Sequence, residues 1–230
     1  MKVVILAGGL GSRLSEHTKS IPKPMVKING VPIILRLMTH YSKHGFREFF
    51  IATGYKGNII KKFFKKKFFN WKINVIDTGK KTMTGGRLKR LKKYLKDETF
   101  LMTYGDGLSD VNIKQLIKFH KRNKKMVTLT AVRPAARFGA LKILKNKVKY
   151  FKEKSKVDEG WINGGFFVIN GEFLKYIKGD NTFLEKEPLE KICQRGQLTA
   201  YKHTGFWQCM DTIRDKDILE KLVKKIEKKK

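Results

Sequence analysis

The chain has 230 residues, of which 41% are hydrophobic and 31% charged, and its 52 Lys and Arg against 20 Asp and Glu give a net charge of +32. This length and composition predict one compact globular domain and exclude a disordered chain. No apolar run approaches the ~20 residues that a membrane-spanning helix needs, so we expect no membrane partner.

The excess of basic residues raises the question of a nucleic-acid-binding protein. Only ten of these residues are Arg, and the 42 Lys are spread along the whole chain rather than gathered in one segment. Such a spread favours a solvated, lysine-rich surface. We therefore expect no specific nucleic-acid partner, only weak adhesion to polyanions at low salt.

The N-terminus and the cysteines indicate the compartment. The apolar stretch at residues 3–7 is too short for the hydrophobic region of a secretory signal. Without such a signal, we expect Cys193 and Cys209 to be free thiols in a reducing environment. The predicted location is cytoplasmic.

The first 133 residues predict alternating strands and helices. Residues 3–7 form a β-branched run that ends in glycines, as a buried parallel strand does, and residues 31–44 have a helical period that Gly45 ends. Further strands are predicted at 48–53, 73–77, 100–104 and 126–132, and helices at 58–69, 86–96 and 113–123. This rhythm predicts an α/β fold with a doubly wound, mainly parallel, Rossmann-like sheet.

Beyond residue 133 the pattern changes to a small β-rich elaboration. The polar pair Lys145-Asn146 separates two strands at 140–144 and 147–152, which predicts a hairpin. Later strands are expected at 165–169 and 198–202, and helices at 171–177, 188–195 and 215–228. We expect a single domain over 1–230, with parts at 1–133 and 134–215 and a C-terminal helix at 216–230.

Ligands of open α/β sheets bind at the carboxyl ends of the strands, which directs attention to the glycine-rich loop after the first strand. Gly8, Gly9 and Gly11 leave backbone N–H groups uncovered, and Ser12 and Arg13 add a hydroxyl and a fixed cation. Phosphate oxygens would satisfy these donors. The spacing matches neither a GxGxxG fingerprint nor a P-loop, and a plain tight turn is the alternative interpretation.

A lysine enclosed by prolines follows this loop. The fixed φ angles of Pro22 and Pro24 lower the conformational entropy of the loop and so aim the ammonium group of Lys23. The alternative is one more surface lysine among many. The enclosing prolines favour a positioned cation.

Two aspartates predict a magnesium site. Asp106 directly follows an apolar strand and Asp211 follows a strand-like segment and a loop, where carboxylates suit a Mg²⁺ ion that bridges phosphates. Asp106 could instead cap a helix or a turn. Glu153-Lys154 and the segment before the strand at 165 add a charged pair and a close-approach backbone, or else surface charges and a bulge.

Together these segments resemble the glucose-1-phosphate cytidylyltransferases, a branch of the sugar nucleotidyltransferase superfamily. The resemblance runs in order along nearly the whole chain, through the motifs LAGGLGSRL, IPKPMVKING, GYKGNIIKKFF, MTGGRLKR, TYGDG, RFGAL, FKEK, INGGFFVIN and GFWQCMDTIRDK. The glycine-rich loop with its downstream Pro-Lys is typical of the superfamily, and TGGRLKR and INGGFFV are more particular to the cytidylyl branch.

The resemblance implies a nucleotide-diphospho-sugar transferase fold and an activity. A cytidylyl group would pass from CTP to a sugar 1-phosphate, expected to be glucose 1-phosphate, giving a CDP-sugar and pyrophosphate for surface polysaccharide, lipopolysaccharide or deoxysugar biosynthesis. Mg²⁺ would be the cofactor. Residues 1–133 would mainly bind the nucleotide and 134–215 the sugar phosphate. The alternative is the same fold with another nucleotide or another phosphorylated acceptor.

The resemblance also implies roles for individual residues. Arg13 and Lys23 would be catalytic cations that hold the triphosphate and the sugar phosphate, and Asp106 and Asp211 would bind the metal. The nucleotide would contact Leu6, Ala7, Gly8, Gly9, Gly11, Ser12, Thr84, Gly85, Gly86, Arg87 and Gly105. The hexose and its phosphate would contact Gly139, Glu153, Lys154 and Asn163.

Some features depart from the family pattern. The chain is shorter between residues 69 and 77 and lacks a tryptophan-containing tail, which leaves a homo-oligomer as one possibility among others. Ser155 stands where proline is common, and Cys209 precedes Met210-Asp211. Small residues at Gly85 and Gly86 are expected to let cytosine approach the backbone. No general base is needed, so the five histidines are expected to be structural.

Overall fold

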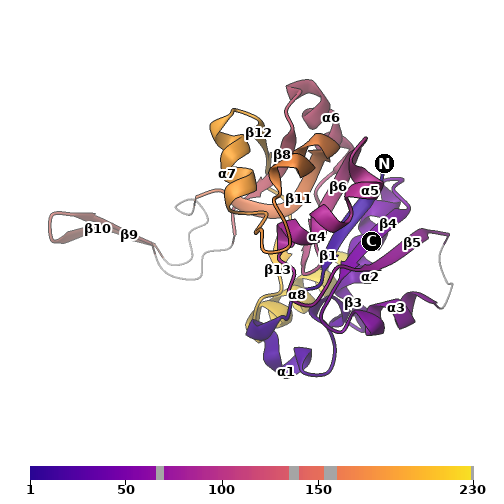
Figure 1. The fold of residues 1–230 in the computed structure, drawn as a ribbon. Coiled ribbons are helices and arrows are strands. Elements are labelled where there is room, and N and C mark those ends of the chain that lie inside the picture. Colours follow the sequence, from indigo (N-terminus) through magenta and orange to yellow (C-terminus); the bar gives the residue numbers. More distant parts are fainter. Residues whose placement is uncertain (66–69, 135–139, 153–159, 229–230) are drawn as a thin grey trace.

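The computed structural model describes residues 1–65, 70–134, 140–152 and 160–228. At its centre lies a seven-stranded sheet with the order β12-β8-β11-β6-β1-β4-β5 (Figure 1). Its strands are β1 (Val3–Ala7), β4 (Glu48–Thr53), β5 (Lys72–Asp77), β6 (Thr99–Tyr104), β8 (Val127–Val132), β11 (Ile162–Asn170) and β12 (Leu198–His203). Neighbouring strands are parallel except at β11, which is antiparallel to β6 and β8. The predicted fold class is confirmed.

The central strand β1 shows why the sheet carries a hydrophobic core on each face. All of its residues are buried, and its side chains alternate between the cores, because Val3 and Ile5 pack in one and Val4 and Leu6 in the other. The helices that contribute buried residues to the first core are α2 (Ile33–Lys43), α3 (Gly57–Lys65), α6 (Ile113–Asn123) and α8 (Ile213–Glu227). Those of the second core are α4 (Thr84–Arg90), α5 (Lys92–Leu95) and α7 (Glu187–Gln194).

The predicted elements are present, with differences at their ends. The helix expected at 86–96 is divided into α4 and α5, and the one expected at 171–177 is a 3₁₀ segment, η3 (Gly171–Tyr176). Helix α3 ends at Lys65, and the rest of its predicted range, 66–69, lies outside the described residues. Strand β11 begins at Ile162, earlier than expected.

The two parts expected at 1–133 and 134–215 share one sheet. Strand β11, from the second part, lies between β6 and β8 of the first, with Phe167 opposite both Met102 and Leu129. The predicted hairpin is confirmed as the antiparallel pair β9 (Ala140–Leu144) and β10 (Lys147–Lys152), which projects from the body in Figure 1. The elaboration is therefore continuous with the central sheet through β11.

Two short strand pairs outside the central sheet were not predicted. Strand β7 (Gly107–Ser109) pairs antiparallel with β13 (Trp207–Cys209), and β2 (Lys27–Ile28) with β3 (Val31–Pro32). Strands of two or three residues are too short to show a period in the sequence. The β7–β13 pair matters most, because it joins the segment after β6 to the segment before α8.

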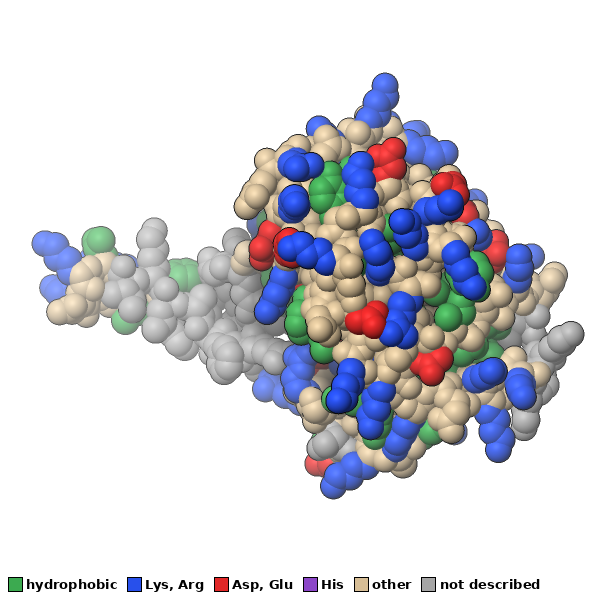
Figure 2. Space-filling model, in the orientation of Figure 1, with side chains coloured by type: hydrophobic (Ala, Val, Ile, Leu, Met, Phe, Trp, Pro, Cys, Tyr) green, Lys and Arg blue, Asp and Glu red, His purple; other side chains and the backbone are tan. Residues whose placement is uncertain are grey.

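The surface charge, the cysteines and the helices bear on three further predictions from the sequence. Lys and Arg side chains are scattered over the face shown in Figure 2, as the sequence predicted. Cys193 and Cys209 are free thiols, which confirms that prediction. Among the described residues, none of the helices has the length and apolar character needed to cross a membrane.

Candidate active site

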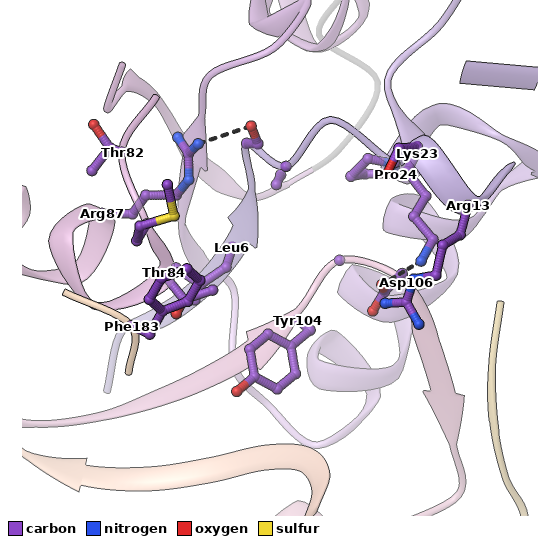
Figure 3. A pocket seen from close by; sticks show the side chains of 17 residues that line it. Leu6, Arg13, Lys23, Pro24, Thr82, Thr84, Arg87, Tyr104, Asp106 and Phe183 are labelled. Atoms are coloured by element: carbon purple, nitrogen blue, oxygen red, sulfur yellow. Dashed lines mark hydrogen bonds and ion pairs between the residues drawn. The ribbon is translucent and has the colours of Figure 1, made fainter. Parts of the chain in front are cut away.

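A cavity of about 340 Å³ opens where β1 and β6 end (Figure 3). This volume lies in the range usual for small-molecule sites. Of the predicted site residues, the structure places in its lining Leu6, Ala7, Gly8, Gly9, Gly11, Ser12, Arg13, Lys23, Thr84, Arg87, Gly105 and Asp106. The rest of the lining consists of Pro24, Thr82, Met83, Tyr104 and Phe183. Residues far apart in the sequence thus meet at the predicted edge of the sheet.

The glycine-rich loop forms one wall of the cavity. Gly11 has a φ of +67°, which favours glycine, and it leads into the 3₁₀ turn η1 (Ser12–Leu14) through the hydrogen bond from Leu14 N to Gly11 O. A Cβ on Gly8 would collide with the guanidinium of Arg87. At Gly9, by contrast, a Cβ would meet only open space, so the protein's own packing does not require glycine there.

Lys23 is held between two carboxylates at the edge of the site. It begins the 3₁₀ turn η2 (Lys23–Met25), after Pro22, and its side chain is only 11% exposed. Its Nζ lies 2.7 Å from Asp106 Oδ2 and 2.7 Å from Asp211 Oδ1. Burial lowers the pKa of Lys23, but the charges and hydrogen bonds of Asp106 and Asp211 outweigh it and raise that pKa above its ordinary value. The ammonium group is therefore charged at neutral pH.

The β7–β13 pair brings the two aspartates together. Gly107 pairs with Cys209, and the backbone N–H of Met210 donates to Asp106 O at 2.8 Å. Asp211 also accepts from Arg13 Nη1 at 2.9 Å, although the Arg13 side chain is 73% exposed. The two predicted cations and the two predicted metal ligands thus contact one another; Arg13, Lys23 and Asp106 line one end of the cavity, and Asp211 lies behind them outside the lining.

This cluster suits a divalent cation that shares its ligands with a substrate. The two carboxylates face the same point, now held by one ammonium group, and carboxylate oxygens are the ligands that Mg²⁺ prefers. In the described part of the chain, no group of three or more His, Cys, Asp or Glu side chains could hold a metal ion. The residues therefore fit Mg²⁺ with further ligands from phosphate or water.

Neither a thiol nor an imidazole serves the cavity as a reactive group. Burial, followed by the charges of Asp211 and Asp106, raises the pKa of Cys209 to about 11, so this thiol stays neutral. No described histidine lies in the lining. The described lining offers charged groups and hydroxyls, and no described imidazole lies beside a hydroxyl there to activate it.

Comparison with known proteins identifies the family. The family model described as nucleotidyl transferase matches residues 2–222. The chain belongs to the nucleotidyl transferase family. It is 49% identical to the glucose-1-phosphate cytidylyltransferase of Salmonella typhimurium, covering 98% of this chain and 96% of that protein.

More distant relatives of this nucleotidyl transferase differ in the base that their names state. The chain is 32% identical to the D-glycero-alpha-D-manno-heptose 1-phosphate guanylyltransferase of Campylobacter jejuni, covering 84% of this chain and 85% of that one. The crystal structure of HddC from Yersinia pseudotuberculosis superimposes with a TM-score of 0.77 at 28% identity, covering 96% of this chain and 99% of that one. The fold of this chain is therefore shared with a solved structure that differs from it at most positions.

Arg87 of this nucleotidyl transferase supports the cavity wall from behind. The residue is 4% exposed, and its guanidinium donates to the carbonyls of Gly8, Thr53 and Gly79 at 2.8 to 2.9 Å, and to Thr78 Oγ1 at 2.8 Å. Burial lowers its pKa. Arg87 borders the cavity, as predicted. Its hydrogen bonds to the three carbonyls connect the carboxyl ends of the parallel strands β1, β4 and β5.

Gly85 and Gly86 do not lie where the expected approach of a base would require them. Neither lies in the lining of the cavity. A Cβ on Gly85 would lie 2.7 Å from Thr182 O, and one on Gly86 would lie 2.4 Å from Asp180 O. The backbone that approaches these glycines closely is the protein's own, in the segment 179–184. The two glycines in the sequence indicate that another group packs closely against them. The sequence does not indicate whether that group is a ligand or the protein's own backbone.

The sugar side of the site is described only in part. Asn163 lies at the start of β11, where its Oδ1 accepts from Gly165 N at 2.9 Å. Gly139, Glu153 and Lys154 lie outside the described residues. Their assignment to the hexose and its phosphate stays a prediction.

Two functional candidates were missed from the sequence. Tyr104 lines the cavity and donates from its hydroxyl to Glu185 Oε1 at 2.6 Å, while Thr84 Oγ1 donates to Glu185 Oε2 at 2.7 Å. Burial, then the nearby Glu185 carboxylate, raises the pKa of Tyr104, and a hydrogen bond with Asn163 acts in the opposite direction. The position of Tyr104 next to Gly105-Asp106 was a usable signal, whereas nothing local marks Glu185.

Proposed function

We propose that the protein transfers a cytidylyl group from CTP to glucose 1-phosphate, giving CDP-glucose and pyrophosphate. The observation that supports the transfer is the position of Lys23. It lies between Asp106 and Asp211, on the opposite side of the cavity from Thr84 and Arg87, where we place the nucleotide (Figure 3). The choice of CTP and glucose 1-phosphate rests on the Salmonella relative, which matches nearly the full length of both chains.

The residue types suit a reaction between two polyanions. A phosphate oxygen of glucose 1-phosphate forms a bond to the α-phosphorus of CTP, and the bond from that phosphorus to the bridging oxygen breaks, so that pyrophosphate leaves with the electron pair. The attacking phosphate is already ionised at pH 7, so no general base is required. The protein must align the two phosphates and neutralise the charge between them.

Arg13 and Lys23 supply that neutralising charge in our proposal. The guanidinium of Arg13 presents a planar fork to phosphate oxygens, and its high exposure leaves it free to change partner. The ammonium of Lys23 is a compact charge that the turn η2 holds in place. Both line the cavity, so each can reach a phosphate there.

We assign Mg²⁺ to Asp106 and Asp211, whose oxygens meet at one point. When bound, this ion would neutralise charge on the phosphates and help to orient them. Lys23 would then exchange part of its contact with the carboxylates for contact with phosphate. Asn163, together with Gly139, Glu153 and Lys154, is proposed to bind the sugar phosphate.

The nucleotide wall is proposed to take the base and ribose between β1 and α4. Leu6 and Thr84 line this end of the cavity, with Phe183 beside them, 42% exposed (Figure 3). An exposed aromatic ring at the rim of such a cavity offers a face for a base or a sugar. The reaction is assigned to the cytoplasm, where CTP is available, and to supply of a CDP-sugar for polysaccharide or deoxysugar synthesis.

Product analysis tests the proposal. The protein is incubated with Mg²⁺, each of the four ribonucleoside triphosphates and dTTP, and a panel of sugar 1-phosphates, and the products are separated by chromatography and identified by mass. We expect CDP-glucose as the main product. Preferred use of GTP, as the name of the Campylobacter relative would suggest, would leave the family intact and overturn the choice of CTP.

A further inference from the structure

One carboxylate at the rim of the cavity joins its two walls. Glu185 accepts from Thr84 Oγ1 with one oxygen, at 2.7 Å, and from the Tyr104 hydroxyl with the other, at 2.6 Å. Thr84 begins helix α4 on the nucleotide side, and Tyr104 ends strand β6 in front of Asp106. Both oxygens of one exposed acid are therefore used inside the protein, between residues that line the cavity.

The segment that carries Glu185 is firmly attached to α4. Three backbone N–H groups make the attachment: Met83 N donates to Asp180 O at 2.8 Å, Gly86 N donates to Thr182 O at 3.2 Å, and Leu184 N donates to Thr84 Oγ1 at 2.9 Å. The side chain of Leu184, next to Glu185, is fully buried. Because this attachment leaves little freedom to the backbone at 185, the carboxylate stays near Thr84 when the cavity is filled.

Tyr104 continues the connection to the sugar side. Its ring packs edge-on against Phe167, with centroids 5.9 Å apart, and a Cβ on Gly165 would touch the ring. Gly165 in turn donates from its backbone N–H to Asn163 Oδ1 at 2.9 Å. A line of contacts therefore runs from Asn163 through Gly165, Tyr104 and Glu185 to Thr84.

We propose that Glu185 is a positioning residue that couples the nucleotide site to the sugar-phosphate site. The proposal rests on the proposed function, which places the nucleotide at Thr84 and the sugar phosphate at Asn163. A ligand that orders Thr84 also orders Glu185 and Tyr104, so the second ligand meets a wall that is already ordered and binds more tightly. Glu185 itself need touch neither substrate.

The test measures how much each substrate tightens the binding of the other. Isothermal calorimetry gives the Kd of glucose 1-phosphate, in Mg²⁺, with and without a CTP analogue that cannot be cleaved between its α- and β-phosphates. For the wild type we expect the analogue to lower this Kd about fivefold or more, a usual size for coupling between sites. For Glu185→Ala and Tyr104→Phe we expect less than about a twofold change, since either substitution removes the hydrogen bond between Tyr104 and Glu185.

Two further variants separate positioning from general damage. Glu187→Ala removes a neighbouring acid that is paired with Lys178 Nζ at 2.7 Å, away from the cavity, and should keep the wild-type ratio of Kd values. Glu185→Gln keeps the length of the side chain and one accepting oxygen, so it should restore part of the coupling. The Glu185 and Glu187 variants should unfold at the temperature of the wild type, because both side chains are exposed, and a thermal melt of Tyr104→Phe, whose ring is half-buried, shows that this variant is folded at the assay temperature.

The outcomes separate this inference from the proposed function. The ratio that decides is the Kd of glucose 1-phosphate without the CTP analogue divided by the Kd with it. If Glu185→Ala has the same ratio as the wild type, or if the analogue does not change the Kd of the wild type, the coupling role is overturned even though CDP-glucose is formed. If the wild type forms no CDP-glucose, the proposed function fails, and the ratio is measured with the substrate pair that it does use, where the same two results decide. If the protein uses no pair of a nucleoside triphosphate and a sugar 1-phosphate, both the proposed function and the coupling role are overturned.

Discussion

The two ends of the cavity are held by different kinds of interaction. At the nucleotide end, the buried guanidinium of Arg87 binds the carbonyls of Gly8, Thr53 and Gly79, so that end is joined to the backbone of the sheet. At the other end, Lys23 and the exposed Arg13 contact carboxylates through ion pairs. The first arrangement is a preformed surface, and the second consists of pairs that phosphate and a metal ion can replace.

This difference predicts which changes affect activity and which affect stability. Removing a charge from the ion-pair end should reduce turnover and leave the fold intact, because Arg13 and the two carboxylates that Lys23 contacts are partly exposed, so that water can solvate the charges left behind. Adding a Cβ at Gly85 or Gly86, next to the end proposed for the nucleotide, should lower stability, because backbone packs there against backbone.

The largest effect is expected from removal of the metal ion. Chelation with EDTA should abolish CDP-glucose formation, and an excess of Mg²⁺ should restore it, because Asp106 and Asp211 are anionic and repel the phosphates unless a cation is held between them. Pyrophosphate release measures this. Asp106→Asn should raise the Mg²⁺ concentration needed for half-maximal rate. Turnover that persists in EDTA would show that the ion is not needed.

The next largest effect should come from the two cations. Lys23→Ala and Arg13→Ala should each lower kcat/KM by about two or more orders of magnitude, the ~3 kcal/mol scale of one preorganised donor to developing charge. The control is Lys61→Ala, an exposed lysine on α3, which should change nothing. A Lys23→Ala protein as active as the wild type would remove this residue from the catalytic site.

A smaller effect is expected for the choice of base. Cytosine offers an amino donor at N4 and an acceptor at N3, whereas uracil and thymine reverse both, so a site that pairs with one leaves groups unpaired with the other. We expect kcat/KM for CTP to exceed that for UTP and dTTP at least about tenfold, or about 1.4 kcal/mol. A higher value for UTP or dTTP would contradict the cytidylyl assignment.

The smallest effect on turnover should come from Gly86, where stability changes instead. Gly86→Ala places a Cβ 2.4 Å from Asp180 O and should lower the free energy of unfolding by about 1 to 3 kcal/mol, which thermal unfolding detects as a lower Tm. The control Gly179→Ala meets no atom within 4 Å. An unchanged Tm for Gly86→Ala, with weaker CTP binding, would return Gly86 to the base site.

Local signals predicted some elements closely and failed for others. Helix α6 lies at its predicted bounds, and both of its ends are set by local contacts: Asn112 Oδ1 accepts from Gln115 N at 3.0 Å, and Lys124 is left-handed with a φ of +50°. The break between α4 and α5 was missed because the residues there suit a continuous helix. The pair β7–β13 was missed because its strands meet only through a contact between distant segments.

The sequence by itself determined the parallel sheet, the turn at Gly11 and the cation between prolines, because hydrophobic period and backbone freedom are properties of neighbouring residues. Only the tertiary structure decided that Lys23 lies between Asp106 and Asp211, that Gly86 faces Asp180, and that Glu185 joins Thr84 to Tyr104. Each of these contacts joins residues from separate elements, and their distance is set by how strands and helices pack rather than by spacing along the chain.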